Sequence, residues 1–173
     1  MGEDVVTVVA DDLGHHDFLE MADGTLATVD FDVRPLDGLD VAGDQLVEHY
    51  PDGTSRVVWS AWDCLTPEIA EDYIRSPLGV DWTHVNGIWY DEANDDWYFS
   101  FYTFEEIRKL HNGTTEWVLG GDHNEFSING GSFGPQHAPQ WDGDGIWLFD
   151  NDSNSNHSRV QRSMFSRTDG HAA

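Results

Sequence analysis

The strongest constraint on the fold is a pattern of histidine, turn and strand that occurs more than once along the chain. His16 and His137 are each followed, after six residues, by an Asp-Gly pair and then by a strand-like run, "TLATVD" and "IWLFD" respectively. A third copy opens at His84, where "EANDD" lengthens the turn. Self-similarity at a fixed spacing predicts a repeat architecture in which each copy is one supersecondary unit.

The segments between these histidines read as short antiparallel strands, which predicts an all-β fold. Runs such as "SRVVWSAW", "NGIWY", "WYFSFYTF" and "TEWVLG" are rich in Val, Ile, Trp, Tyr and Phe, the residues that favour strands. Dipeptides that favour tight hairpins separate them, because both central residues of such a turn have positive φ. These dipeptides are Asp23-Gly24, Asp52-Gly53, Asn112-Gly113 and Asp144-Gly145.

Units of four short strands with a Trp near the end are typical of β-propeller blades. We expect blade-like units at about 15–62, 81–122 and 133–173, with a helical insertion at about 66–76. There Thr66 is placed to cap a helix and Pro67 to occupy its first position. Because a closed propeller has at least four blades, we expect these three to belong to a longer reading frame, or to close by association between copies.

The charge balance restricts the partners. The chain has 33 acidic and 8 basic residues, a formal net charge of -25, which predicts repulsion from nucleic acid and from anionic membranes. Such a surface is typical of a protein kept soluble in concentrated salt, as in halophiles, although a plain acidic protein has the same balance. No run approaches the length of a membrane span, and no secretory signal is recognisable near Met1. Cys64 is the single cysteine, so an internal disulfide is excluded.

Three histidines at one position of a repeat predict a shared site. If the units are equivalent, His16, His84 and His137 begin the innermost strands and converge near the axis. Strand alternation would place His84 and Asn86 on the same side. A group of imidazoles can act as nucleophile, acid, base, anion-binding site or metal ligand set. The alternative is that each histidine only satisfies a backbone group at a strand start.

Four blocks of sequence in this order resemble the arylsulfotransferase family, from about His15 to Asn151. They are "HHDFLEMADGTL", "DWTHVNGIWYDEANDDWYFSF", "TEWVLGGD" and "FGPQHAPQWDGDGIWLFDND". They are similar to the family's His-Asp opening of a blade, its D-W-x-H-x-N block, its W-x-L-G-G strand end, and its Q-H block followed by an L-F-D-N strand.

The resemblance implies a six-bladed propeller whose histidine takes a sulfuryl group from a phenolic sulfate ester and passes it to a phenol. His137 in "QHAP" matches the nucleophile, His84 and Asn86 match residues that hold sulfuryl oxygens and pass protons, and His16 matches the first active-site histidine. This chemistry requires no cofactor, and neutral imidazole is a good nucleophile. Family members are commonly exported to the periplasm or cell exterior.

One position departs from the family pattern. The family usually has an arginine in an "S-x-R" strand, and this sequence has Tyr102 in the triplet "SFY". A tyrosine can donate a hydrogen bond to a sulfate but brings no positive charge. Arg108 is a possible substitute, although the register of "EEIRKL" predicts a solvated outer strand for it. Trp82 beside His84 is a candidate contact for an aromatic substrate, with blade packing as the alternative.

Two other functions are compatible with the same residues. A non-catalytic propeller that only binds ligands would explain Tyr102 and the incomplete set of blades. A metal-dependent hydrolase would use the three histidines as ligands. The sequence favours the sulfuryl transferase over both.

Overall fold

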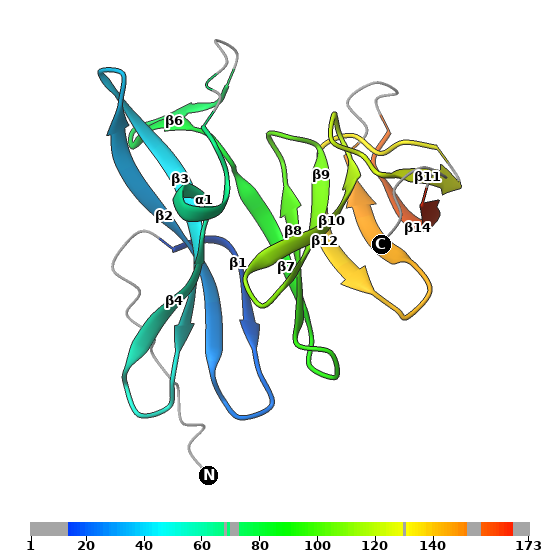
Figure 1. Cartoon of the computed structure of the whole chain (residues 1–173), viewed down its shortest axis with the longest axis horizontal. Coiled ribbons are helices and arrows are strands. Elements are labelled where there is room, and N and C mark those ends of the chain that lie inside the picture. The colour runs from blue at the N-terminus through cyan, green and yellow to red at the C-terminus, as the bar shows by residue number, and fades with distance from the viewer. Residues whose placement is uncertain (1–13, 68, 70–72, 130, 152–156, 168–173) are drawn as a thin grey trace.

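The computed structural model describes residues 14–67, 69, 73–129, 131–151 and 157–167, which form a mostly β fold of three sheets standing side by side (Figure 1). In the figure, the first sheet runs from blue through cyan to the green of β6, the second from green to yellow-green, and the third from yellow to the red end of β14. The predicted all-β class is confirmed at this level, apart from one short helix, α1 (Ala61–Cys64).

The first sheet has six strands. Four of them follow one another along the chain, and a short pair is added after α1. The strands are β1 (Gly14–Glu20), β2 (Leu26–Leu36), β3 (Leu39–His49), β4 (Ser55–Ser60), β5 (Arg75–Ser76) and β6 (Gly79–Asp81). Strand β3 is long enough to pair in parallel with β6 near its start and antiparallel with β4 near its end.

The second and third sheets each have four antiparallel strands. The second contains β7 (Val85–Asp91), β8 (Asp96–Phe101), β9 (Glu106–His111) and β10 (Thr114–Gly120), in the order β10-β9-β8-β7. The third contains β11 (Phe126–Asn129), β12 (Gln136–Trp141), β13 (Ile146–Asp150) and β14 (Arg159–Arg167). Its order is β11-β14-β13-β12, so the strand that comes first in the chain closes the far edge of the sheet.

Each predicted strand overlaps an observed strand, although "SRVVWSAW" continues into α1 and "WYFSFYTF" continues past the end of β8. The local prediction of a helix at about 66–76 is wrong for the residues described there. Arg75 and Ser76 form β5, and the helix that the structure contains is α1, which lies before that segment. Residues 68 and 70–72 lie outside the described part. A Thr-Pro pair such as Thr66 and Pro67 begins a helix only when the residues after it form an apolar face that packs against the rest of the protein.

The hairpin turns follow the predicted chemistry in only one of the four predicted pairs. Asn112 and Gly113 both have positive φ, at 51° and 75°, and join β9 to β10 through a two-residue loop. At the other three predicted pairs at most the glycine has positive φ, because those loops are longer. The sequence reading also missed the turn at Asp37 and Gly38, which joins β2 to β3 with both residues at positive φ.

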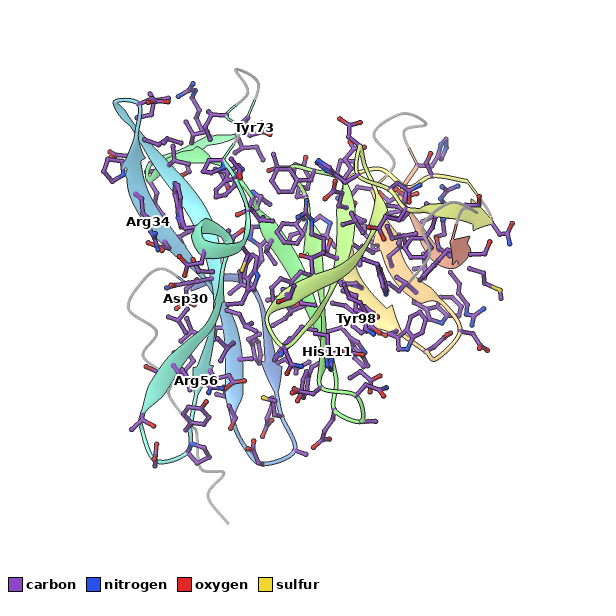
Figure 2. All side chains as sticks on the ribbon, in the orientation of Figure 1. Asp30, Arg34, Arg56, Tyr73, Tyr98 and His111 are labelled. Carbon is purple, nitrogen blue, oxygen red and sulfur yellow. The ribbon has the colours of Figure 1, made fainter. Side chains whose placement is uncertain are left out.

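Two hydrophobic layers hold the sheets together, one on each face of the second sheet (Figure 2). Alternation along β8 supplies both layers: Phe99 and Phe101 pack toward the first sheet, and Tyr98 packs toward the third, where its ring stacks on Trp141 at 5.7 Å. Trp59 lies in the first layer and Trp117 in the second. The tryptophans therefore act mainly as packing residues between sheets.

Candidate functional site

One edge strand of each sheet, β1, β7 or β12, lies at the junction of the three sheets. Strand β7 packs against β1 on one side and against β12 on the other. Each of the three strands contains a β-bulge near its start, between Gly14 and Phe18 in β1, between Val85 and Gly87 in β7, and after His137 in β12. Relative to the paired strand, the irregularity adds two residues in β1 and one residue in each of β7 and β12, and it changes the direction of the side chains there.

The backbone at these bulges supports part of the predicted equivalence. His16 and His84 have positive φ, at 58° and 48°, a conformation uncommon for residues other than glycine. In the third strand the residue with positive φ is Ala138, at 51°, and not His137. His137 therefore stands one residue earlier than strict equivalence predicts.

Four of the predicted site residues form a continuous series of rings, which we call the histidine row: His16, His84, Tyr102 and His137. The ring centroids of His16 and His84 are 4.6 Å apart, those of His84 and Tyr102 are 4.8 Å apart, and those of Tyr102 and His137 are 6.3 Å apart. Tyr102, which replaces the family's arginine, thus lies between two of the histidines. The structure brings together side chains that are up to 121 residues apart in the sequence.

A buried carboxylate orients His84. Its Nδ1 lies 2.6 Å from Oδ2 of Asp81, whose side chain is only 4% exposed. The backbone carbonyl of His84 also accepts a hydrogen bond from the Tyr102 backbone N–H at 3.0 Å. With Nδ1 bound to Asp81, Nε2 is the ring nitrogen left for a ligand.

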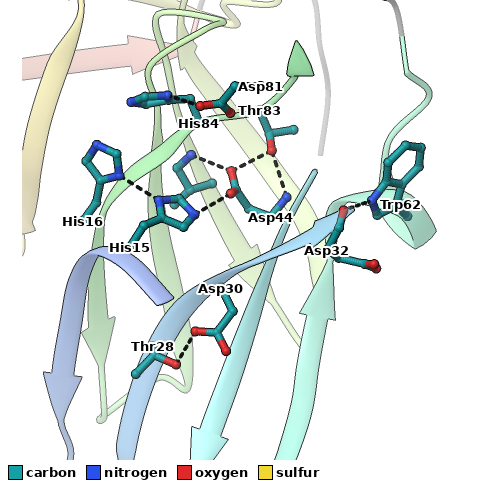
Figure 3. Close-up of polar contacts among 11 residues, drawn as sticks. His15, His16, Thr28, Asp30, Asp32, Asp44, Trp62, Asp81, Thr83 and His84 are labelled. Atoms are coloured by element: carbon teal, nitrogen blue, oxygen red, sulfur yellow. Dashed lines mark hydrogen bonds and ion pairs between the residues drawn. The ribbon is translucent and has the colours of Figure 1, made fainter. Parts of the chain in front are cut away.

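His16 lies at the end of a chain of hydrogen bonds that begins inside the first sheet (Figure 3). Its Nδ1 is 2.7 Å from Nδ1 of His15, and Nε2 of His15 is 2.8 Å from Oδ1 of Asp44. Asp44 is fully buried. Asp17, the residue after His16, accepts a hydrogen bond from the backbone N–H of Ile88 through Oδ2 at 3.0 Å and so fastens β1 to β7.

Asn86 is the extra residue of the β7 bulge, and the expected alternation with His84 does not hold there. Its Nδ2 donates to the backbone oxygen of Gln136 at 2.7 Å, which fastens β7 to β12, while its buried Oδ1 has no hydrogen-bond partner among the described residues. The adjacent Gly87 permits this close approach: a Cβ there would lie 2.7 Å from the Ala138 backbone nitrogen. One Asn86 amide N–H is therefore used by the fold.

His137 is partly buried and is contacted by the side chain of Asn151, the residue that follows β13. Nδ2 of Asn151 lies 3.2 Å from its Nδ1. An asparagine amide can meet either form of that nitrogen, by donating N–H or by presenting its oxygen, so the amide orientation and the His137 tautomer change together. When Nδ1 carries the proton, Nε2 has the free lone pair that a nucleophile needs.

Burial and neighbouring imidazoles lower the pKa of two of these histidines and so disfavour their protonated form. Burial lowers the pKa of His137, and the charge that His84 can carry lowers it further. Burial is also the largest cause that lowers the pKa of His16, followed by His84, His15 and His137, with Asp44 acting in the opposite direction. Neutral imidazole is the form that can attack an electrophile or accept a proton.

Two further residues considered from the sequence lie away from the row. Trp82 is 1% exposed and packs on Trp62 at 5.1 Å between centroids, so the packing interpretation holds for it in this structure. Arg108 is 9% exposed, so the prediction of a solvated position is wrong. Its guanidinium binds Oε2 of Glu106 through two nitrogens, at 2.8 and 2.6 Å.

The basic side chains whose ion pairs the structure describes all bind carboxylates outside the histidine row. They are Arg34 with Asp32, Arg56 with Glu48, Arg108 with Glu106, Lys109 with Asp96 and Glu116, Arg159 with Asp150, and Arg162 with Asp142. Any positive charge supplied by the row therefore comes from protonated imidazole. Within the described ranges, no three His, Cys, Asp or Glu side chains lie close enough to hold a metal ion.

Four supporting residues were missed from the sequence: His15, Asp44, Asp81 and Asn151. Asp44 carried the clearest signal, because it stands in the mainly apolar stretch "VAGDQLV", where an unpaired carboxylate would be costly. Asp81 stands three residues before His84, but only the turn between β6 and β7 shows that the two side chains meet.

Comparison with known proteins adds one positive finding. The family model described as arylsulfotransferase (ASST) matches residues 11–169, nearly the whole chain. A search of curated proteins found no match. In the described part of the chain, no helix has the length and apolar character needed to span a membrane.

Proposed function

The chain belongs to the arylsulfotransferase family, and from that membership we propose that it transfers a sulfuryl group from a phenolic sulfate ester to a phenolic acceptor. His137 is the nucleophile and carries the group as a sulfohistidine between two half-reactions. The observation that carries this assignment is the histidine row, which places His137 beside Tyr102, His84 and His16 where three sheets meet.

In the first half-reaction, the lone pair of His137 Nε2 attacks the sulfur of the aryl sulfate. The bond between sulfur and the aryl oxygen breaks, and the oxygen keeps its electron pair. Protonated His84 donates a proton from Nε2 to that oxygen, and Asp81, bound at Nδ1, holds the ring for the transfer. A phenol leaves.

The second half-reaction reverses these roles for the acceptor. The acceptor hydroxyl gives its proton to Nε2 of His16 while its oxygen attacks the sulfur, and the bond between sulfur and His137 breaks with its electron pair returning to nitrogen. His16 then gives up a proton to water and His84 takes one up, so both rings regain their starting forms before the next turnover. The remaining amide N–H of Asn86 and the Tyr102 hydroxyl are the neutral donors for the sulfuryl oxygens. The lowered pKa of His137 supports this cycle, because a neutral ring is ready to attack at neutral pH.

We also propose that the three sheets are blades of a propeller, in units close to 15–62, 81–122 and 133–173. The order of the strands supports this, because each sheet turns its β1, β7 or β12 toward the junction. Three such sheets do not close a ring, which takes at least four blades.

The test is release of nitrophenolate from 4-nitrophenyl sulfate by the full chain, with and without phenol and with and without a chelator. Assays run from low to high NaCl, because the net charge of -25 repels an anionic donor unless salt screens it. The proposal expects multiple-turnover release that needs phenol and survives the chelator, with phenyl sulfate formed in equal amount.

Other outcomes identify the rival functions. Release that is lost with the chelator would replace the transferase by a metal-dependent hydrolase. Binding of 4-nitrophenyl sulfate without release at any salt concentration would indicate a propeller that binds ligands only, and would place the cause at Tyr102. Tyr102→Arg should then restore release, because it returns a fixed cation next to His84 and His137.

A further inference from the structure

We propose that Asp44, His15 and His16 form a proton relay that fixes His16 with its proton on Nδ1 and leaves Nε2 free as the base for the acceptor phenol. The relay rests on the proposed function for its chemical role, but its protonation pattern can be tested without any activity. His15 and Asp44 are positioning residues in this proposal, since neither touches the reacting groups.

The hydrogen bonds around Asp44 leave it only one orientation. Oδ2 accepts the Val85 backbone N–H and the Thr83 hydroxyl, each at 2.6 Å. The Thr83 oxygen in turn accepts the backbone N–H of Asp44 at 3.0 Å, so its single hydroxyl proton is committed to Oδ2. Oδ1 then faces Nε2 of His15 at 2.8 Å, and a carboxylate oxygen there accepts the proton of Nε2.

His15 transmits this constraint to His16. A neutral imidazole that carries its proton on Nε2 has only a lone pair on Nδ1. The two Nδ1 atoms of His15 and His16 are 2.7 Å apart, so His16 must donate, and its own lone pair is on Nε2. The His15 ring cannot easily turn to escape, because it stacks on Phe31 at 3.7 Å and its side chain is 10% exposed.

The relay gives the incoming proton a favourable destination. When Nε2 of His16 takes the proton of the acceptor hydroxyl, the Nδ1 proton of His16 can pass to Nδ1 of His15. The positive charge then lies on His15 beside Asp44 and not on His16. The charged and titratable groups that face His16 are His15, Asp44, His84 and His137. Of these groups only Asp44 favours a positive charge, so transfer of the proton from His16 to His15 stabilises that charge.

Asp44 also links the relay to the opposite half of the site. Through Val85 it holds the residue that follows His84, and through Thr83 the residue that precedes it. One carboxylate therefore sets the protonation of His16 and the position of His84.

Asp44→Asn tests the relay with little change of shape. The Val85 N–H and the Thr83 hydroxyl still need an acceptor, so the asparagine oxygen takes the place of Oδ2 and the NH₂ group faces His15. Nε2 of His15 must then accept, its Nδ1 carries the proton and donates to His16, and His16 shifts its own proton to Nε2. The substitution should therefore invert the tautomer of His16.

The direct measurement is the ¹⁵N chemical shift of each ring nitrogen in the full chain labelled with ¹⁵N-histidine, with His16 assigned by the resonances that disappear in His16→Gln. We expect the proton of His16 on Nδ1 in the parent and on Nε2 in Asp44→Asn. Asp30→Asn is the matched control: it changes another buried carboxylate of the same sheet, bonded to Thr28, and should leave His16 unchanged. A parent with the proton on Nε2, or no change in Asp44→Asn, would overturn the relay.

Kinetics provide the second measurement. Asp44→Asn should slow the acceptor half-reaction by about 10²-fold, because a base is lost, while the initial burst of nitrophenolate stays. Equal slowing of burst and turnover would contradict the relay and indicate displacement of His84. If the parent shows the expected tautomer but transfers no sulfuryl group, the proposed function fails and the relay stands.

His15→Phe keeps the test open if Asp44→Asn does not fold. Phenylalanine can stack on Phe31, and residue 15 makes no contact with Val85 or Thr83 among the described hydrogen bonds. The His16 Nδ1–H then loses its acceptor, so its ¹⁵N resonance should move and the acceptor half-reaction should slow. An unchanged His16 spectrum would count against the relay.

Discussion

Asp44 and Glu106 are both fully buried carboxylates that bind a histidine, at 2.8 Å to Nε2 of His15 and at 2.6 Å to Nδ1 of His123. His15 is 10% exposed and passes its hydrogen bond on to a second imidazole. His123 is 71% exposed. A buried carboxylate orients a histidine in both regions, but only the first lies within a series of rings where a proton can be passed on.

The two carboxylates also differ in what neutralises them. Arg108 binds Glu106 through two nitrogens and lies over the rings of Phe101 and Phe104, at 5.2 and 5.5 Å. Asp44 is bound by neutral donors and by His15. Glu106 therefore already has a permanent countercharge and serves the fold, whereas Asp44 can stabilise a proton that arrives during a reaction.

The largest difference between the regions should appear on removal of one imidazole from each. His137→Ala should reduce sulfuryl transfer by about 10³-fold or more, because it removes the proposed nucleophile while His84 and His16 keep their proposed roles as acid and base. His123→Ala, the matched control, should keep the parent rate. The measurement is nitrophenolate release with phenol present, with folding checked by circular dichroism. Parent activity in His137→Ala would remove the nucleophile assignment, and loss in His123→Ala would remove the comparison.

Substitutions in the region around Glu106 should lower the free energy of unfolding more than substitutions around Asp44. Glu106→Leu leaves Arg108 buried without a partner, and breaking a buried pair in this way costs about 3–5 kcal/mol. Glu106→Gln should cost less, because an amide oxygen can still accept from the guanidinium. Urea unfolding at fixed salt measures both. A loss below about 1 kcal/mol for Glu106→Leu would show that the pair is solvated and that Arg108 is not held by it.

A third substitution separates packing at the junction from the chemistry of the rings. Gly87→Ala places a Cβ 2.7 Å from the Ala138 nitrogen and 2.8 Å from Cδ of Pro139, so β7 and β12 must move apart. We expect a loss of about 1–3 kcal/mol, together with slower transfer as His137 moves from Tyr102. Gly38→Ala is the control: it is strained by its φ of 81° but meets no atom within 4 Å. It should lower stability without changing the rate per folded molecule, and equal rates in both variants would contradict the role of this contact.

The sequence predicted those parts of the fold that depend on local chemistry. The strand-forming runs and the turn at Asn112 and Gly113 were recoverable because propensity and turn geometry act over a few residues. The grouping of His16, His84 and His137 was also predicted, because equivalent positions in repeated units are expected to lie at equivalent places around a common axis. The resemblance to the family, now supported by the match over residues 11–169, rested on the same blocks.

What the sequence did not predict depends on register and on contacts between sheets. No residue type in the sequence marks these bulges, so the role of Asn86 as the extra residue of β7 could not be predicted. The positive φ at Ala138 in place of His137 could not be predicted for the same reason. Asp44 meets His15 across 29 residues, a pairing set by the alignment of β1, β2 and β3. Arg108 looked solvated because its partner Glu106 lies on the same strand, and the covering layer comes from elsewhere.

The smallest expected effect is the pH dependence of stability, which reports the histidine row alone. Burial first, and then the charge of His84, lowers the pKa of His137, and burial likewise leads the causes that lower the pKa of His16. In the unfolded chain both groups titrate near the ordinary histidine value of about 6.5, so below that pH the unfolded state binds more protons than the folded state. The stability that the neutral rings contribute is complete above about pH 6.5 and is lost as the pH falls through their folded pKa values.

Urea unfolding of the parent and of a variant with both His16→Gln and His137→Gln, measured from pH 7.5 to pH 5, isolates this contribution because carboxylate effects are common to both proteins. The parent should lose stability more steeply with acidification, and parallel curves would mean that the rings of the row are no harder to protonate than histidines in solvent.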